Sequence, residues 1–237
     1  MKNAKIITYD TIPKELRKAV TEVSIPFGVE SIGNWAFNNC TSLKSIIIPD
    51  SVESIGRSAF YYCTSLKSIT IPDSVKSIGS GAFASCESLK SITIPDSVES
   101  ISDWAFENCT SLENIVIPKS IKSIEYKAFA GCESLKSIMI PDSVKSIGDS
   151  AFYYCTSLNS IIIPDSVKSI RNYAFAYCTS LKSIMIPDSV ESIGDYAFAY
   201  CTSLNEVIFK GKTIDQVNAM DYYPWGIKDT STIRCKN

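Results

Sequence analysis

The sequence predicts a solenoid, a rod built from stacked coils, because three features return at one fixed interval. Cysteine, proline and an Ala-Phe pair each recur every 23 residues, and their first and last copies are Cys40 and Cys201, Pro26 and Pro187, and Ala36-Phe37 and Ala197-Phe198. A fixed period of this length is typical of repeat proteins, in which each unit packs on its neighbours. We therefore expect eight 23-residue repeats, beginning at Pro26, within one domain.

Each repeat is expected to contain one strand and one tight turn. In the third repeat, residues 72–94, Ile92 and Ile94 alternate as in a strand, whereas Phe83 and Cys86 are three residues apart, as in one helical turn. No segment is long enough for a crossover helix, so the strands must pair between coils. The predicted fold is an α/β solenoid with parallel strands stacked coil on coil, short helical or 3₁₀ turns on the other side, and a cap at each end.

The repeat motifs resemble a known family. The segments Leu-x-x-Ile-x-Ile-Pro, Ser-Val-x-Ser-Ile-Gly and Ala-Phe-x-x-Cys are similar to the BspA-like subclass of leucine-rich repeats, over about residues 20–209. The resemblance implies binding to other proteins, in known members often at a microbial cell surface as adhesins. The asparagine of the general leucine-rich motif is absent. We expect the serine row that runs every 23 residues from Ser31 to Ser192 to satisfy backbone groups in its place.

The two ends depart from the repeat and are expected to cap the strand edges. The predicted divisions are an N-terminal cap at 1–19, the solenoid at 20–209 and a C-terminal cap at 210–237. A short helix is expected at Pro13–Lys18. The run Thr213–Gln216 has the form of a capping box that opens a second helix, and residues 231–235 are expected to add a last strand. The C-terminal segment resembles caps in repeat proteins of bacteria and their phages.

The nine cysteines are interpreted as free thiols, eight of them in the core. Each of these eight lies three residues after an inward Phe and three before an inward Leu, and stacked Cβ vectors do not favour the dihedral angle of a disulfide. A single row of thiols does not supply a tetrahedral set of metal ligands. We predict no metal and no cofactor, and Cys235 alone is expected to react quickly.

The composition argues against an enzyme. The chain has no histidine, which excludes nucleophiles activated by histidine, and the aspartate that begins almost every repeat after its proline is interpreted as a turn former. No break in the repeat brings a unique set of polar residues together. Catalytic residues are therefore not predicted.

Charge and hydropathy limit the partners. The net charge of −2 argues against a nucleic-acid footprint, and the apolar runs are too short to span a membrane. Residues 1–10 lack the hydrophobic stretch of a secretory signal. We expect a cytoplasmic monomer; the alternative is a cell-surface location if a leader was removed.

Two surfaces are candidates for binding a protein partner. The first is the row of outward strand residues, with Met139, Ile162, Met185 and Ile208 in its C-terminal half, and the second is a tyrosine cluster on the turn side, with Tyr154, Tyr177 and Tyr200. The expected function is that of a non-catalytic protein-protein interaction module. The alternatives are a fragment of a microbial adhesin and a phage or mobile-element inhibitor that docks on a host defence protein.

Overall fold

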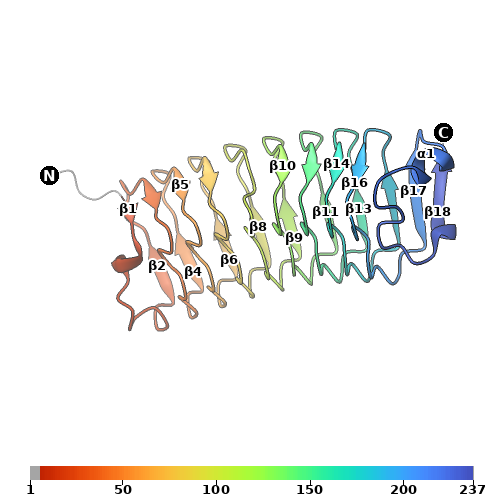
Figure 1. Ribbon diagram of the computed structural model, residues 1–237. Helices are drawn as coiled ribbons and strands as arrows, with labels where there is room; N and C mark the ends of the chain where they lie inside the picture. Colours follow the sequence, from red (N-terminus) through yellow and green to blue (C-terminus); the bar gives the residue numbers. More distant parts are fainter. Residues whose placement is uncertain (1–5, 237) are drawn as a thin grey trace.

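The computed structural model describes residues 6–236 as one rod of coils stacked in the order of the sequence (Figure 1). Short strands run along two sides of the rod and pair in parallel between successive coils, with breaks in the hydrogen-bonded ladders after Ser45–Ile47, Ser77–Ile78 and Asn114–Val116. Ser137 pairs with Ser160 and Met139 with Ile162, so the register advances by one 23-residue repeat. This confirms the predicted solenoid of parallel strands.

Strands on one side of the rod form what we call the strand face. They are β2 (Glu22–Ser24), β4 (Ser45–Ile47), β6 (Ser68–Thr70), β8 (Ser91–Thr93), β9 (Asn114–Val116), β11 (Ser137–Met139), β13 (Ser160–Ile162), β15 (Ser183–Ile186), β17 (Glu206–Lys210) and β18 (Ile233–Lys236). A second line of two-residue strands comprises β1 (Ile6–Ile7), β3 (Ser31–Ile32), β5 (Ser54–Ile55), β7 (Ser77–Ile78), β10 (Ser123–Ile124), β12 (Ser146–Ile147), β14 (Ser169–Ile170) and β16 (Ser192–Ile193).

Each coil contributes the same side chains to a continuous core. The phenylalanines from Phe37 to Phe198 form one stack, with ring centroids 5.2 to 5.8 Å apart and planes within 1° to 8° of parallel. All eight rings are buried, as are the Leu and Ile side chains of the strands. Because each ring packs against the equivalent ring of the next coil, the core is as periodic as the sequence.

The cysteine row lies inside this core, and no cysteine of the described chain forms a disulfide. The thiol of Cys63 donates a hydrogen bond to the Phe37 carbonyl oxygen, and this bond recurs in each coil up to Cys201, at 3.1 to 3.3 Å. Burial raises the pKa of Cys109 and Cys155 to about 12. The thiols therefore act as small core residues and as donors between coils, and the second role was not anticipated.

The turn side differs in detail from the prediction, because no helix or 3₁₀ turn occurs within the described repeats. Consecutive β-turns stand there instead. The N–H of Tyr153 donates to the Ser150 carbonyl within its own coil, whereas the N–H of Tyr154 donates to Ala176 of the next coil. Ser150 and Tyr154 adopt left-handed φ angles of 55° and 61°. Every second N–H is thus turned toward the next coil, so a helix cannot continue.

The serine prediction was wrong in its row. Where the structure gives hydroxyl partners for the predicted row, they are side chains: Ser31 bonds to Ser54 at 2.8 Å, and Ser123 donates to Glu125. Backbone carbonyl groups are satisfied by a different row, Ser51, Ser74, Ser97, Ser120 and Ser166, whose hydroxyl groups donate to a carbonyl group of the preceding coil at 2.5 to 2.8 Å. This row follows the Pro-Asp turn, where a short side chain reaches the backbone below.

The N-terminal end is closed by one buried side chain. The predicted helix at Pro13–Lys18 is a series of turns, and η1 (Tyr9–Thr11) precedes it. Arg17 from these turns donates to the carbonyl oxygens of Ala36 at 3.2 Å and Asn38 at 2.9 Å. Within the stack, the equivalent carbonyl groups accept from backbone N–H groups of the preceding coil. Arg17 therefore supplies the hydrogen-bond donors that the backbone of a preceding coil supplies elsewhere in the stack. Residues 1–5 of the expected cap lie outside the described residues.

The C-terminal end follows the prediction more closely. Helix α1 (Ile214–Asn218) opens with the predicted capping box, in which Thr213 and Gln216 exchange hydrogen bonds. The chain then passes through η2 (Thr230–Thr232) and adds β18 beside β17. On the turn side, the Trp225 carbonyl oxygen accepts from the Phe198 N–H at 3.0 Å, which replaces the bond that a further coil would make.

Candidate functional site

The predicted apolar row is exposed on the strand face through three coils. The side chain of Met139 is 80% exposed, that of Ile162 is 75% exposed and that of Met185 is 40% exposed. Register pairs Met139 with Ile162 and Ile162 with Met185, so the three side chains follow one another along the rod. Because alternate strand residues face outward, their neighbours Ile138, Ile161 and Ile184 are buried and hold the backbone in place.

Ile208 does not belong to this exposed row, and its prediction as a surface residue was wrong. It is only 7% exposed. Its register partners are Met185 on β15 and Arg234 on β18, so a long side chain flanks it on each side. The repeat pattern gave no sign of this burial, because β18 comes from the cap and carries no repeat motif.

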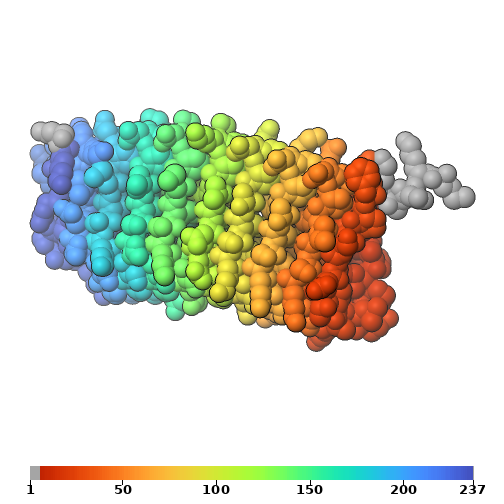
Figure 2. Space-filling view, turned by 180° about the vertical axis from the view of Figure 1, so that it is seen from behind, coloured from red at the N-terminus to blue at the C-terminus, as the bar shows by residue number. Residues whose placement is uncertain are grey.

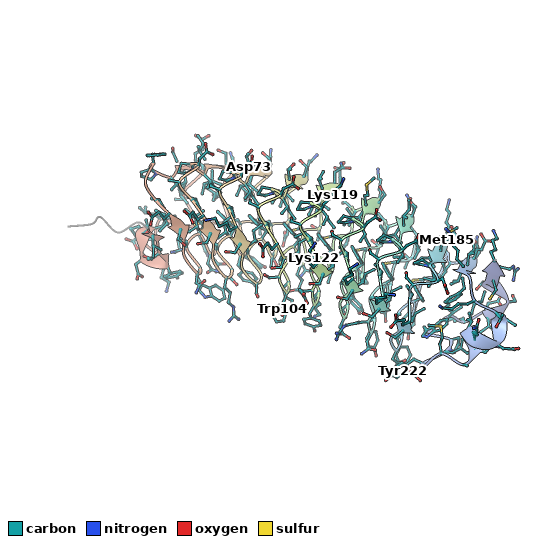
Figure 3. All side chains as sticks on the ribbon, turned by 90° about the horizontal axis from the view of Figure 1, so that it is seen from above. Asp73, Trp104, Lys119, Lys122, Met185 and Tyr222 are labelled. Atoms are coloured by element: carbon teal, nitrogen blue, oxygen red, sulfur yellow. The ribbon has the colours of Figure 1, made fainter. Side chains whose placement is uncertain are left out.

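Charged rows border the apolar row at both ends of the strands. Exposed lysines precede the strands at Lys44, Lys67, Lys90, Lys136 and Lys182, and exposed aspartates follow them at Asp50, Asp73, Asp96, Asp142, Asp165 and Asp188. One coil has the opposite charges, with the exposed Glu113 in the lysine row and the exposed Lys119 in the aspartate row. Figure 3 shows Asp73 and Met185 along the same side of the rod. The strand face is therefore polarised, with a basic margin, an apolar centre and an acidic margin.

The tyrosine cluster lies on the opposite side. Trp104 and Tyr222, both on the turn side, are on the edge of the rod away from Met185 (Figure 3). In successive coils, the rings of Tyr154 and Tyr177 have centroids 5.8 Å apart, and those of Tyr177 and Tyr200 stack at 4.5 Å. Desolvation and the neighbouring phenol groups of Tyr200 and Tyr153 raise the pKa of Tyr177.

All three of these tyrosines have left-handed backbone angles. Their φ angles are 61°, 62° and 59°, and the same position in the other coils is occupied by Asn39, Tyr62, Ser85, Asn108 and Gly131, again with positive φ. Asparagine and glycine suit this conformation, whereas an aromatic residue there is strained by about 1 to 2 kcal/mol. Backbone preference therefore does not explain the tyrosines.

A break in the repeat was overlooked in the sequence. Where the other repeats begin Pro-Asp-Ser or Pro-Lys-Ser, the first begins Pro26-Phe27-Gly28. Phe27 is 87% exposed and borders an open pocket of about 470 Å³ that also contains Glu30 and Glu53. Comparison of the repeats within the chain could have revealed this substitution.

The described residues offer few other candidates. Among residues 6–236, no three His, Cys, Asp or Glu side chains come together in a group that could hold a metal ion. Nor does any helix in this range have the length and apolar character needed to cross a membrane.

The fold, the 23-residue register and the Leu-Ile strand motif define a leucine-rich repeat protein, a class whose repeats are a typical non-catalytic scaffold and generally mediate protein interactions. The family model for the BspA type leucine rich repeat region matches residues 16–136 and 122–223. The chain belongs to this family.

Solved structures of bacterial leucine-rich repeat proteins are similar to the chain. A protein from Bacteroides ovatus is 34% identical with a TM-score of 0.73, and the match covers 92% of this chain and 61% of that one. One from Eubacterium ventriosum is 31% identical with a TM-score of 0.62, over 67% and 43%. A leucine rich cell surface protein from Faecalibacterium prausnitzii is 31% identical with a TM-score of 0.53, over 79% and 69%. The chain thus spans less than two thirds of the first two proteins. No curated protein sequence matches it.

Proposed function

We propose that this chain is a non-catalytic module that binds a protein partner on its strand face, centred on Met139, Ile162 and Met185. The observation that carries the proposal is the run of exposed apolar side chains in four successive coils, because Val116 in the coil before Met139 is also exposed. Two of them are methionines, which strand propensity alone does not favour. Methionine is flexible and polarisable and suits a binding surface. A contiguous apolar patch with a polar border is typical of a protein interface.

The charged margins define the partner that suits this surface. We infer a partner with an apolar centre, acidic groups that face the lysine row and basic groups that face the aspartate row. Such complementarity mainly sets the orientation and the rate of association, whereas the apolar centre supplies most of the affinity. The stiff sheet also limits the entropy lost on binding.

Affinity capture from a bacterial lysate tests the proposal. The double variant Met139→Glu, Met185→Glu should lose the captured partner, because binding would bury charge without a counterion. The matched control is Ile47→Glu, Thr93→Glu, which places the same charges, again two coils apart, at exposed positions of the same row but outside the apolar run. The control should capture the partner normally. The free energy of unfolding of every variant should lie within about 0.5 kcal/mol of the parent value. Capture by both double variants at the parent level would refute the strand-face site.

The tyrosine cluster is the second candidate surface. The strained backbone of its tyrosines favours it, because residues that oppose local preference concentrate at functional sites. The variant Tyr154→Asn, Tyr177→Asn, Tyr200→Asn uses the residue that Asn39 and Asn108 provide at this position, so the coil geometry is retained. Loss of capture in this variant, with capture retained by the glutamate variant, would assign binding to the turn side.

Two locations are proposed as alternatives. The row of free buried thiols supports a cytoplasmic protein. The similarity to a cell surface protein of Faecalibacterium prausnitzii supports a surface location. Fractionation of the source cells, with protease treatment of intact cells, distinguishes the two.

A further inference from the structure

The charges that border the strand face are arranged symmetrically about its central row. Lys136 lies three residues before Met139 and Asp142 lies three residues after it, and these offsets recur in the other coils between residues 44 and 188. Opposite charges therefore stand at equal distances on the two sides of the outward row. In the coil with the opposite charges both members are exchanged, so Glu113 and Lys119 keep the same offsets.

Most of these charges have no partner within their own chain. Asp188 pairs with Lys212 at 3.2 Å, but across residues 6–236 no ion pair includes any other member of the two margins. Asn159 is the one uncharged member of the lysine row. The margins therefore present unpaired charge of both signs on either side of an exposed apolar run, and a second molecule could pair with them.

We propose that the strand face of one copy of this chain pairs with the strand face of a second copy, through a two-fold axis parallel to the rod. This operation reverses the direction across the strands and keeps the position along the rod, so each side chain before a strand faces the side chain after the same strand of the other copy. Lys136 then faces Asp142, and Met139 and Ile162 face their own equivalents. A dimer would replace the monomer expected from the sequence.

The charges select this arrangement over its alternatives. If the two-fold axis ran along the strands, lysines would face lysines and aspartates would face aspartates, which opposes association. If one rod were shifted by a coil, Glu113 would face an aspartate and Lys119 would face a lysine of the neighbouring coil. The alignment of equal coils pairs Glu113 with Lys119 and keeps opposite charges together in the other coils. The exchanged coil thus fixes the register of the pairing.

The strand face has the size of an ordinary interface. Between residues 44 and 188 it is about 34 Å long and about 20 Å wide, at about 4.8 Å per coil and about 3.3 Å per residue. It would bury about 700 Å² on each copy, close to the roughly 800 Å² per partner of a standard complex. The inference rests on the proposed function in one respect, since both use the exposed apolar run. Self-pairing would cover that run until a different partner binds.

Sedimentation equilibrium of the whole chain, from about 5 µM to about 1 mM, tests the pairing. The parent protein should be a dimer at the upper concentrations. Lys136→Asp places two carboxylates opposite each other at both symmetric contacts, and it should weaken dimerisation at least about tenfold. Asp142→Lys places two ammonium groups there and should weaken it to a similar extent. The double variant Lys136→Asp, Asp142→Lys copies the exchange of Glu113 and Lys119 and should recover the parent affinity. Both side chains are exposed, so the variants should fold.

A mixture of the two single variants gives the sharpest test. In a dimer of Lys136→Asp with Asp142→Lys, both contacts again join opposite charges, so the mixture should associate although each variant alone does not. A fluorescent label on the Asp142→Lys chain follows its entry into dimers. The matched control replaces Lys136→Asp by Lys228→Asp, which has the same net charge but changes an exposed lysine beside Tyr200 on the turn side. Lys228→Asp should dimerise like the parent and leave the labelled chain largely monomeric.

Three results would overturn the inference. A parent protein that stays monomeric at the highest concentration would exclude self-pairing. Single variants with the parent affinity would place the dimer contact on another surface, and a mixture that fails to associate would exclude the alignment of equal coils.

The lysate experiment separates this inference from the proposed function. A monomeric parent that still captures a different partner through the apolar run would retain the proposed function and reject self-pairing. A dimer with the expected response to the charge variants, but without capture of any other protein, would retain self-pairing and reject a different partner.

Discussion

The strand face and the tyrosine cluster are built on the same coils with the same 23-residue period, yet their backbones differ. On the strand face, extended residues such as Ile162 pair in register, and β-branched side chains suit them. On the turn side, Tyr154 and its equivalents adopt positive φ. The local backbone therefore favours a large exposed side chain on one surface and disfavours it on the other. An exposed Ile on a strand follows local preference, whereas an exposed Tyr in a left-handed turn opposes it.

This difference shows which side chains require an explanation beyond folding. Thr70 and Thr93 on the strand face are ordinary strand residues, and so is Ile162 taken alone. The methionines of the strand face and the tyrosines of the turn side are not favoured locally. Both sets are concentrated in the C-terminal coils, which makes this half the better candidate for binding.

Alkaline pH should destabilise the core that supports both surfaces. We expect it to cause the largest loss in the free energy of unfolding. Burial raises the pKa of thiols such as Cys109 and Cys155 to about 12, whereas an exposed thiol has a pKa of about 8.5. Above about pH 8.5 the unfolded chain loses thiol protons that the folded chain retains. The free energy of unfolding should therefore be fully retained below this pH and fall by about 1.4 kcal/mol per pH unit for each such thiol.

Thermal melting followed by circular dichroism between pH 8 and pH 10 measures this loss. In Cys155→Ala the fall with pH should correspond to one thiol proton fewer, although the variant starts from a lower stability. A melting temperature that stays constant from pH 8 to pH 10 would contradict the buried thiol row.

Removal of one ring from the shared core should have the next largest effect. Phe106 is fully buried and stacks between Phe83 at 5.6 Å and Phe129 at 5.5 Å. Phe106→Ala should lower the free energy of unfolding by about 3 to 5 kcal/mol, because rings held by their own coils cannot close the cavity. Urea denaturation measures the change. A loss below about 1 kcal/mol would mean that the coils slide together more freely than the stack implies.

One substitution made on each surface should change the free energy of unfolding by small amounts of opposite sign. Ser150 on the turn side has a φ of 55°, and Gly81 occupies the same repeat position in another coil. Ser150→Gly should therefore stabilise the protein by up to about 1 kcal/mol. Ser160→Gly, at an exposed position of β13, should destabilise it by about 0.5 to 1 kcal/mol. Chemical denaturation of both variants checks the pair, and equal signs would contradict the distinction between the surfaces.

Periodicity explains how much could be predicted. A 23-residue spacing of Pro, Phe and Cys is sufficient for the stack, the parallel register and the buried thiols, because each coil repeats the same local problem. The predictions failed where the structure depends on the cap or on hydrogen bonds between coils, which the repeat motif does not encode. Ile208 is buried by a strand from the cap, and the tyrosine turns are shaped by bonds between coils that helical spacing cannot reveal. The pocket beside Phe27 could not be predicted from the shared motif, because it lies at the one repeat whose Pro-Asp-Ser turn is replaced by Pro-Phe-Gly.

The two ends have a consequence for the length of the rod. Arg17 imitates the donors of a coil at one end, and the Trp225 carbonyl group imitates the acceptor of a coil at the other. Both ends form hydrogen bonds with backbone groups that every repeat has at the same position. Whole repeats could therefore be duplicated or lost between them by recombination without redesign of either terminus. In evolution, the length of the rod can therefore change in steps of one whole coil while both terminal structures stay the same.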